Sequence, residues 1–187
     1  LVTSLGMLQG ASIVASSLET DVLPLRVRGY KLSDLDELCA SGEVVWVGAG
    51  AIGSNDGRIR LFFADQVGLL TPAIEKPDSP TSEIHDALRM FLATRGALFF
   101  SQLRAAVPNA TDAEVLTALW DLVWAGEVTN DTFAPLRALL AGGKASSRSA
   151  ASPARARRPR PGRLTRIGPP TGAGRWSLVA PLLQPIP

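Results

Sequence analysis

The stretch Leu35-Asp36-Glu37-Leu38-Cys39-Ala40-Ser41-Gly42-Glu43-Val44 recurs later in the chain as Leu119-Trp120-Asp121-Leu122-Val123-Trp124-Ala125-Gly126-Glu127-Val128. Each copy has the pattern of an apolar helix face, a glycine that ends the helix, and the start of a strand. Upstream, residues 12–18 match residues 97–103, and downstream, residues 57–62 resemble residues 174–179. Three blocks in the same order predict two copies of one structural unit.

The second copy has the clearer signals for secondary structure. Helix-capping side chains and helix-ending residues divide it into regular segments. The expected elements are a helix from Ser82 to about Thr94, an extended piece at 97–100, a short helix at 101–108, a helix from the capping box at 111–114 to about Ala125, and a strand at 127–129. A returning strand completes the unit.

The first copy follows the same plan with a trimmed first helix. The expected elements are helices at about 4–9, 15–22 and 33–40, and strands at 43–47 and 58–63 around a turn at 55–57. Three helices closed by a β-hairpin form the winged-helix arrangement, a relative of the helix-turn-helix. We therefore predict an α+β protein of two tandem winged-helix domains. The predicted boundaries are a domain at 1–64, a linker at 65–81, a domain at 82–180 and a tail at 181–187.

Charge is divided unevenly along the 187 residues. Residues 1–143 hold ten basic and seventeen acidic side chains, a balance of −7, whereas residues 144–187 hold nine basic side chains and no acidic one. Fourteen residues separate Glu43 from Gly57, but forty-seven separate Glu127 from Gly174, so the basic stretch is an insertion in the second wing. Its composition predicts disorder over about 142–173. Such a segment favours nucleic-acid binding, and a solvated spacer is the alternative.

Composition excludes several kinds of protein. With 46% hydrophobic residues the chain can build a core, yet no apolar window is long enough to span a membrane. Cys39 is the single cysteine and His85 the single histidine, so the sequence offers neither an internal disulfide nor a Cys/His zinc site. These features suit a reducing cytoplasm. We expect Cys39 to be a small core residue and His85 to be at the surface or half-buried.

The run Gly48-Ala49-Gly50-Ala51-Ile52-Gly53 is a literal G-x-G-x-x-G after a strand. A dinucleotide site of this type needs a helix whose N-terminus faces the pyrophosphate. An alternating strand follows here instead, and the repeat assigns the run to a wing. We therefore disfavour cofactor binding and expect the glycines to allow a tight, mobile wing tip. No G-x-x-x-x-G-K-[ST] motif occurs, so we expect no cofactor in this segment.

The third helices of both copies are acidic, and acidic side chains face phosphates unfavourably. We therefore expect contacts to the DNA backbone from the wings. The candidate DNA-binding residues are Arg58, Arg60, Lys144, Arg148, Arg155, Arg157, Arg158, Arg160, Arg163, Arg166 and Arg175. Arg26, Arg28 and Lys31, just before the third helix of the first copy, could add to this set. The alternative is that these cations pair with neighbouring acids.

Four tryptophans, Trp46, Trp120, Trp124 and Trp176, offer aromatic surface on which unpaired bases could stack. Packing is the favoured interpretation, because a large aromatic side chain near a core usually finds cover. No nucleophile–base pair and no set of metal ligands stands out in the sequence, so we assign no catalytic or metal-binding residue.

Several segments resemble the C-terminal region of Lhr, the large helicase-related protein family of bacteria, especially its long actinobacterial form. These segments are Val22–Tyr30, Leu35–Leu38, Gly42–Gly48, Ala118–Asp131 and Gly174–Leu178. The likeness covers nearly the whole chain. It implies a piece of an ATP-driven, 3′-to-5′ superfamily 2 DNA helicase and translocase linked to DNA repair, whose motor, with ATP and Mg, lies upstream of this segment.

None of the motor motifs maps onto this chain, and no residue matches the catalytic carboxylate of the uracil-DNA glycosylase activity associated with some members. The expected function is therefore a non-catalytic accessory module that binds DNA, single-stranded or tailed duplex, beside other domains of the same helicase. One alternative is a protein-interaction or oligomerisation scaffold without direct DNA contact. Another is an accessory part of a glycosylase-like module.

Overall fold

The computed structural model describes residues 1–70, 77–142 and 168–183. The first 63 residues, named here the N-terminal module, place their helices around a three-stranded antiparallel sheet with strand order β1-β3-β2. The elements are α1 (Val2–Leu8), β1 (Ile13–Val14), α2 (Ala15–Ser17), the π-helical turn η1 (Leu18–Val22), α3 (Leu23–Arg26), α4 (Leu32–Ala40), β2 (Val44–Ile52) and β3 (Asp56–Phe63).

The described residues 83–142 and 168–183 form the second unit, named the C-terminal module. Its sheet is also three-stranded and antiparallel, with strand order β4-β6-β5, which repeats the order of the first sheet. The elements are α6 (Glu83–Arg95), β4 (Leu98–Phe99), α7 (Phe100–Ala106), α8 (Asp112–Trp124), β5 (Val128–Asn130), α9 (Ala134–Leu140), the 3-10 turn η3 (Pro170–Gly172), β6 (Arg175–Leu178) and the 3-10 turn η4 (Ala180–Leu183). Helix α5 (Val67–Leu70) lies between the modules in the sequence.

Local capping explains where two long helices begin. The hydroxyl of Thr111 accepts from the backbone N–H of Glu114 at 3.2 Å, and the Glu114 carboxylate accepts from the backbone N–H of Thr111 at 2.7 Å, so the capping box predicted for α8 is confirmed. The hydroxyl of Ser82 caps α6 by accepting from the backbone N–H of His85 at 3.3 Å. Capping of this kind is worth about 1 kcal/mol per helix.

Most of the glycine run lies in strand β2 rather than at the wing tip, and only its last residue, Gly53, lies in the turn. Strand β2 continues through it to Ile52, with a bulge between Gly48 and Ala51, and the turn follows. As expected, a strand rather than a helix follows the run. The first glycine, Gly48, has a different role from the predicted one. A Cβ atom at Gly48 would overlap the carbonyl oxygen of Val123 and lie 2.7 Å from its carbonyl carbon. This glycine therefore lets the β2 backbone touch the end of α8.

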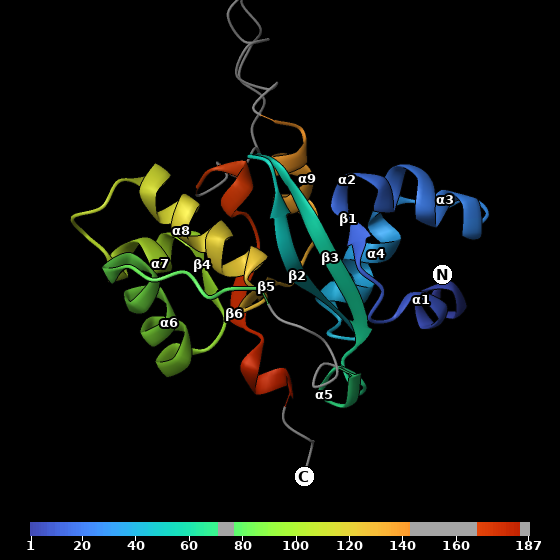
Figure 1. Cartoon of the computed structure of the whole chain (residues 1–187), viewed down its shortest axis with the longest axis horizontal. Coiled ribbons are helices and arrows are strands. Elements are labelled where there is room, and N and C mark those ends of the chain that lie inside the picture. Colours follow the sequence, from blue (N-terminus) through green and yellow to red (C-terminus); the bar gives the residue numbers. More distant parts are fainter. Residues whose placement is uncertain (71–76, 143–167, 184–187) are drawn as a thin grey trace, which may run out of the picture.

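The two modules share one hydrophobic core. Figure 1 shows α1–α4 on one side of the long β2–β3 hairpin and α6–α8 on the other. Buried side chains of both modules form one continuous cluster, and Trp46 of β2 packs edge-on against Phe133, with ring centroids 5.4 Å apart. In addition, the Thr129 hydroxyl donates to the Trp46 carbonyl at 2.6 Å. Strand β2 therefore belongs to both modules as a packing surface.

Several segments differ from their predicted structure. The expected linker at 65–81 contains α5, whose Val67 is fully buried in a second, smaller cluster with Val45, Val47, Phe62 and Val179. Leu182 and Leu183 of the expected tail pack against this second cluster. Residues 168–173, placed in the predicted insertion, include η3, and Gly172 there packs against Phe100. Helix α9 was not predicted. The remainder of the basic insertion, 143–167, lies outside the described residues, as do 71–76 and 184–187.

Within the described part of the chain, no helix combines the length and apolar character that crossing a bilayer requires. Cys39 is buried in the core as expected, and burial raises the pKa of its thiol to about 12. His85 is more buried than expected, at 8% exposed. Its two ring nitrogens lie 2.7 Å from the Ser82 hydroxyl and 3.2 Å from the Asp121 carboxylate, so it joins α6 to α8.

Candidate nucleic-acid interface

Helix α4, the third main helix of the N-terminal module, is tied to the C-terminal module by Arg137. This guanidinium, on α9, donates to both carboxylate oxygens of Glu19, at 2.6 and 2.8 Å, and to Asp36 of α4 at 2.6 Å. Asp36 also accepts from the Thr132 hydroxyl and the Phe133 backbone N–H, both at 2.8 Å. One acidic residue of α4 therefore serves as a docking point for α9.

The pKa directions in this cluster follow from burial and pairing. Burial alone would raise the pKa of Asp36, but hydrogen bonds from Arg137, Phe133 and Thr132 outweigh it and hold this pKa below its ordinary value. Burial and the hydrogen bond to Glu19 raise the pKa of the Tyr30 hydroxyl. Hydrogen bonds to Glu19 and Asp36 outweigh burial and raise the pKa of Arg137. Asp36 and Arg137 therefore stay charged at neutral pH, and Tyr30 stays neutral. The cluster of Arg137 with Glu19 and Asp36 is named here the ionic lock.

Helix α8, the third main helix of the C-terminal module, is docked in turn on the β2–β3 hairpin of the N-terminal module. Its last residue, Trp124, covers Gly57, where an added Cβ would overlap the indole ring. The backbone of the preceding residue, Val123, meets Gly48, as described above. Each third helix is thus held against the other module, which limits its use for entering a DNA groove.

The tryptophans are packed. Trp46 and Trp176 are fully buried, and Trp120 and Trp124 are 6% and 8% exposed. Trp120 and Trp124 lie with ring centroids 5.5 Å apart, and Trp120 also meets Trp176 edge-on at 5.6 Å. The indole N–H of Trp120 donates to the Thr171 carbonyl at 3.1 Å, and that of Trp176 to the Gly172 carbonyl at 3.1 Å. The favoured interpretation, packing rather than base stacking, is confirmed.

The positively charged side chains of the two modules differ in whether they form ion pairs. In the C-terminal module, four of the five described arginines form ion pairs: Arg89 with Glu127, Arg104 with Asp112, Arg137 with Glu19 and Asp36, and Arg175 with Asp131. The fifth, Arg95, lies over the ring of Phe91. In the N-terminal module, no carboxylate among the described residues pairs with any of the five cations, Arg26, Arg28, Lys31, Arg58 and Arg60.

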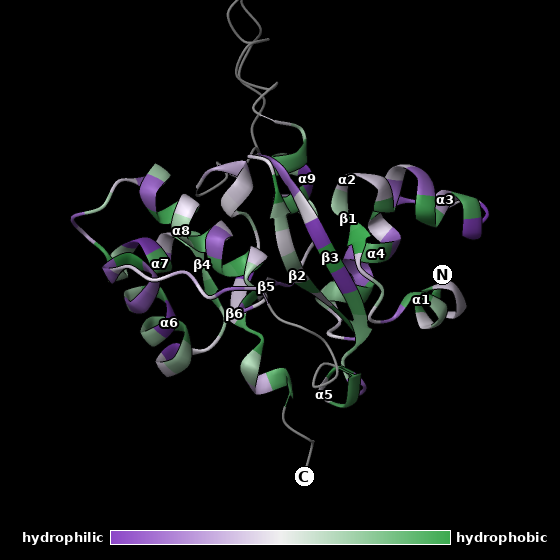
Figure 2. Ribbon diagram, viewed as in Figure 1, coloured by the Kyte–Doolittle hydropathy of each residue, from purple (hydrophilic) through white to green (hydrophobic). Residues whose placement is uncertain are grey.

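The predicted DNA-binding residues therefore occupy different environments. Arg58 is exposed on β3, and Arg60, two residues along, is half-buried, with its pKa lowered by burial. Figure 2 shows the resulting alternation of hydrophilic and hydrophobic bands along β3. Arg175 is exposed but paired with Asp131 at 2.7 Å, as the alternative interpretation held. The other predicted residues, from Lys144 to Arg166, lie outside the described residues.

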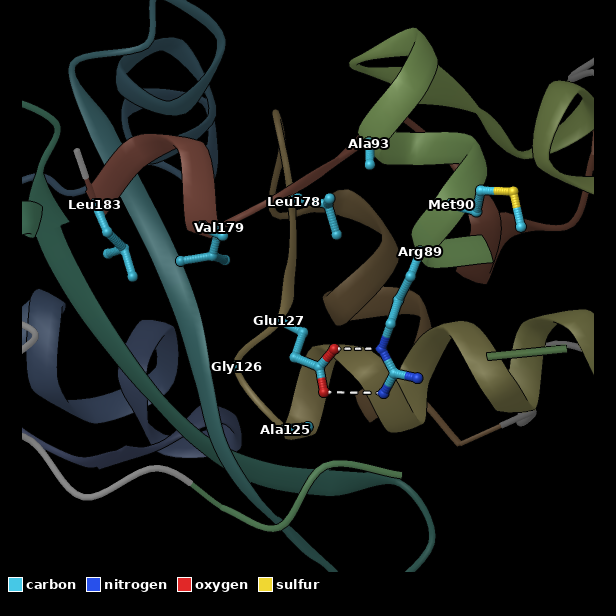
Figure 3. A pocket seen from close by; sticks show the side chains of 10 residues that line it. Arg89, Met90, Ala93, Ala125, Gly126, Glu127, Leu178, Val179 and Leu183 are labelled. Carbon is cyan, nitrogen blue, oxygen red and sulfur yellow. Dashed lines mark hydrogen bonds and ion pairs between the residues drawn. The ribbon is translucent and has the colours of Figure 1, made fainter. Parts of the chain in front are cut away.

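Two surface hollows lie beside α8. The first, of ≈ 440 Å³, has an almost wholly apolar lining that includes Met90, Ala93, Leu178 and Leu183. The ion pair of Arg89 and Glu127, 2.6 Å long, lies at its side (Figure 3). The hydrogen bond from Arg89 is the main reason that the pKa of Glu127 is below its usual value. The second hollow, of ≈ 390 Å³, lies between the β2–β3 turn and α8 and has a mixed lining.

Arg137, the central residue of the interface between the modules, was missed by the sequence analysis. A signal for its helix exists, because Pro135 lies in the first turn of α9, where proline is favoured, and apolar residues recur after it. No sequence signal identifies its partners, since Glu19 and Asp36 are 118 and 101 residues away.

The helices, the antiparallel sheet and the β2–β3 hairpin define the N-terminal module as a winged-helix domain. The family model described as "Large helicase-related protein, winged-helix domain" matches residues 1–64. The resemblance of the chain to the C-terminal region of the Lhr proteins is confirmed.

Two relatives are similar over most of the chain. The "Lhr helicase/ probable uracil glycosylase" of Mycolicibacterium smegmatis is 42% identical over 99% of this chain. The "Lhr helicase/uracil glycosylase" of Escherichia coli strain K12 is 38% identical over 92% of it. The chain spans about 12% of the length of each relative.

Proposed function

We propose that this chain is a non-catalytic segment of an Lhr-type, ATP-dependent 3′-to-5′ DNA helicase and translocase that acts in DNA repair, and that it holds DNA through the phosphate backbone. The proposal includes a second winged helix, formed by the C-terminal module. Its support is the repeated strand order and the order of helices before it. The resemblance to the Lhr proteins supports the helicase context.

One observation carries the DNA-binding part of this proposal. The five cations of the N-terminal module have no described acidic partner, whereas Glu19 and Asp36 of the same module are neutralised by Arg137. Unpaired cations, together with the neutralisation of these two carboxylates, suit a polyanion. Because the third helices are docked, the contacts are with phosphates rather than with base edges, so binding has little sequence preference. The predicted cations from Lys144 to Arg166 extend this surface in the proposal.

A salt series tests the proposal. Fluorescence anisotropy compares the full chain with a variant in which residues 144–166 are replaced by a short Gly/Ser link, on labelled single-stranded, tailed and duplex DNA. The full chain is expected to bind with log affinity falling steeply with log salt, by about 0.9 per phosphate neutralised on duplex DNA. The variant is expected to bind more weakly and with a shallower slope. Absence of binding by the full chain in low salt contradicts the proposal.

A second candidate function, docking of another protein domain, is favoured by the apolar hollow of Figure 3. Met90, which lines it, is 67% exposed and adds to its apolar surface. Other domains of the same helicase are the natural occupants in this case. Binding there would depend little on salt, in contrast to binding of DNA.

A further inference from the structure

We propose that the segment Arg26–Lys31, named here the basic turn, is a binding site for the phosphate backbone of DNA. The inference rests on the proposed function and goes further, because it assigns the contact to a defined part of the N-terminal module. The basic turn joins α3 to α4, apart from the wing and from the insertion, and the sequence indicated its three cations only as a possible addition to the candidates there.

The side chains of the basic turn are free to meet a ligand. Arg26, Arg28 and Lys31 are all exposed, and none of them pairs with a carboxylate among the described residues. Arg26 donates only to a backbone carbonyl, that of Val22, at 3.1 Å. Three positive charges within six residues, without acidic partners, form a concentrated site for phosphates.

The backbone of the basic turn is held in place on both sides. Val27 N–H donates to the Leu23 carbonyl at 2.8 Å, and Lys31 N–H donates to the Asp34 carboxylate at 3.0 Å. In the middle, the Tyr30 hydroxyl donates to Glu19 at 2.6 Å. A held backbone lowers the entropy lost when the cations are ordered on a ligand.

Gly29 gives the turn an open surface. Its φ of +74° is a conformation that other residues rarely adopt, and a Cβ at this position would have no atom within 4 Å. The space directly beside the Gly29 backbone is therefore open, and exposed cations, Arg28 and Lys31, flank this glycine in the sequence.

The ionic lock neutralises two carboxylates of the N-terminal module. Glu19, which holds Tyr30, and Asp36, on α4, are both paired with Arg137. Asp34 accepts from the Lys31 backbone N–H at 3.0 Å but, like Asp21 and Glu37, has no cationic partner among the described residues. Without Arg137, two unpaired carboxylates would lie close to this turn and repel phosphates. The C-terminal module thus prepares the phosphate site of the N-terminal module.

Charge-neutralising substitutions test the inference in the full chain. We expect the triple variant Arg26→Gln, Arg28→Gln and Lys31→Gln to reduce the slope of log affinity against log salt on duplex DNA by about 2 to 3. Its affinity at 0.1 M salt should fall on the order of a hundredfold. The thermal midpoint should change little, because these side chains are exposed and carry no ion pair.

A matched pair of single variants provides the control. Arg28→Gln and Arg95→Gln each remove one exposed arginine, but Arg95 is on α6 of the other module. Arg28→Gln should lower the slope by about 0.9, and Arg95→Gln should leave it unchanged. If the full chain binds DNA and the triple variant keeps its slope, the basic turn is not a contact, although the proposed function stands. If the full chain does not bind DNA, the proposed function itself is wrong.

Discussion

Replacing Arg137 with leucine is expected to lower the free energy of unfolding by about 3 kcal/mol, because it leaves two partly buried carboxylates without their cation. The Glu19 side chain is 10% exposed and the Asp36 side chain 30% exposed, so water compensates in part and the cost is at the lower end of that for a buried pair. This loss is a large fraction of the stability of a typical domain, about 5–15 kcal/mol. Urea denaturation followed by tryptophan fluorescence measures it, since Trp46 lies in the core shared by the modules.

Two further variants distinguish the contribution of the ionic lock to stability from the general effect of losing an arginine. Arg104→Leu removes an exposed pair with Asp112, whose side chain is 67% exposed, and should cost less than about 1 kcal/mol. Adding Glu19→Gln and Asp36→Asn to Arg137→Leu removes the unpaired charges and should restore part of the stability. If Arg137→Leu and Arg104→Leu lowered the free energy of unfolding equally, the ionic lock would be no more stabilising than an exposed ion pair.

Gly48→Ala is expected to destabilise the protein by about 3 kcal/mol, at the upper end of the cost of overpacking. The added methyl group would overlap the backbone of Val123, which cannot move as a side-chain end can. The strand β2 and helix α8 must then separate, and the packing of Trp124 on Gly57 loosens with them. Thermal denaturation of the variant gives the size of the effect.

Gly6→Ala serves as the matched control, because it adds the same methyl group at a helical glycine. A Cβ at Gly6 would meet Phe63 at 3.6 Å, an ordinary contact, and alanine is favoured over glycine in a helix by about 1 kcal/mol. This variant should be neutral or slightly stabilised. A Gly48→Ala variant as stable as Gly6→Ala would show that β2 and α8 do not touch as described.

The local parts of the fold could be predicted because their causes are local. The capping box at Thr111, the cap at Ser82 and the glycine after each third helix determine where elements begin and end. The repeat then gave the order of elements in both modules. Alternation along the hairpin likewise indicated strands β2 and β3, although β2 extends five residues beyond the predicted end at 47.

The docking of the modules could not be predicted, because its contacts join residues far apart in the sequence. Asp36 was interpreted as an acidic residue that disfavours DNA, and nothing in its neighbourhood indicated that Arg137 neutralises it. Gly48 was interpreted as part of a flexible tip for the same reason, since Val123 approaches it only in the folded chain. Part of the acidity of the third helices instead serves packing between the modules, because Asp36 of α4 pairs with Arg137 of α9.

Hydrogen exchange measured by mass spectrometry, with and without DNA, tests the central claim most directly. That claim is that DNA contacts the cations of this chain while both third helices stay docked on the opposite module. Bound DNA should slow exchange in peptides covering 26–31 and 144–166 and leave those covering α4 and α8 unchanged. Protection of α4 or α8 by DNA would contradict the account, because it would place a third helix in contact with the nucleic acid.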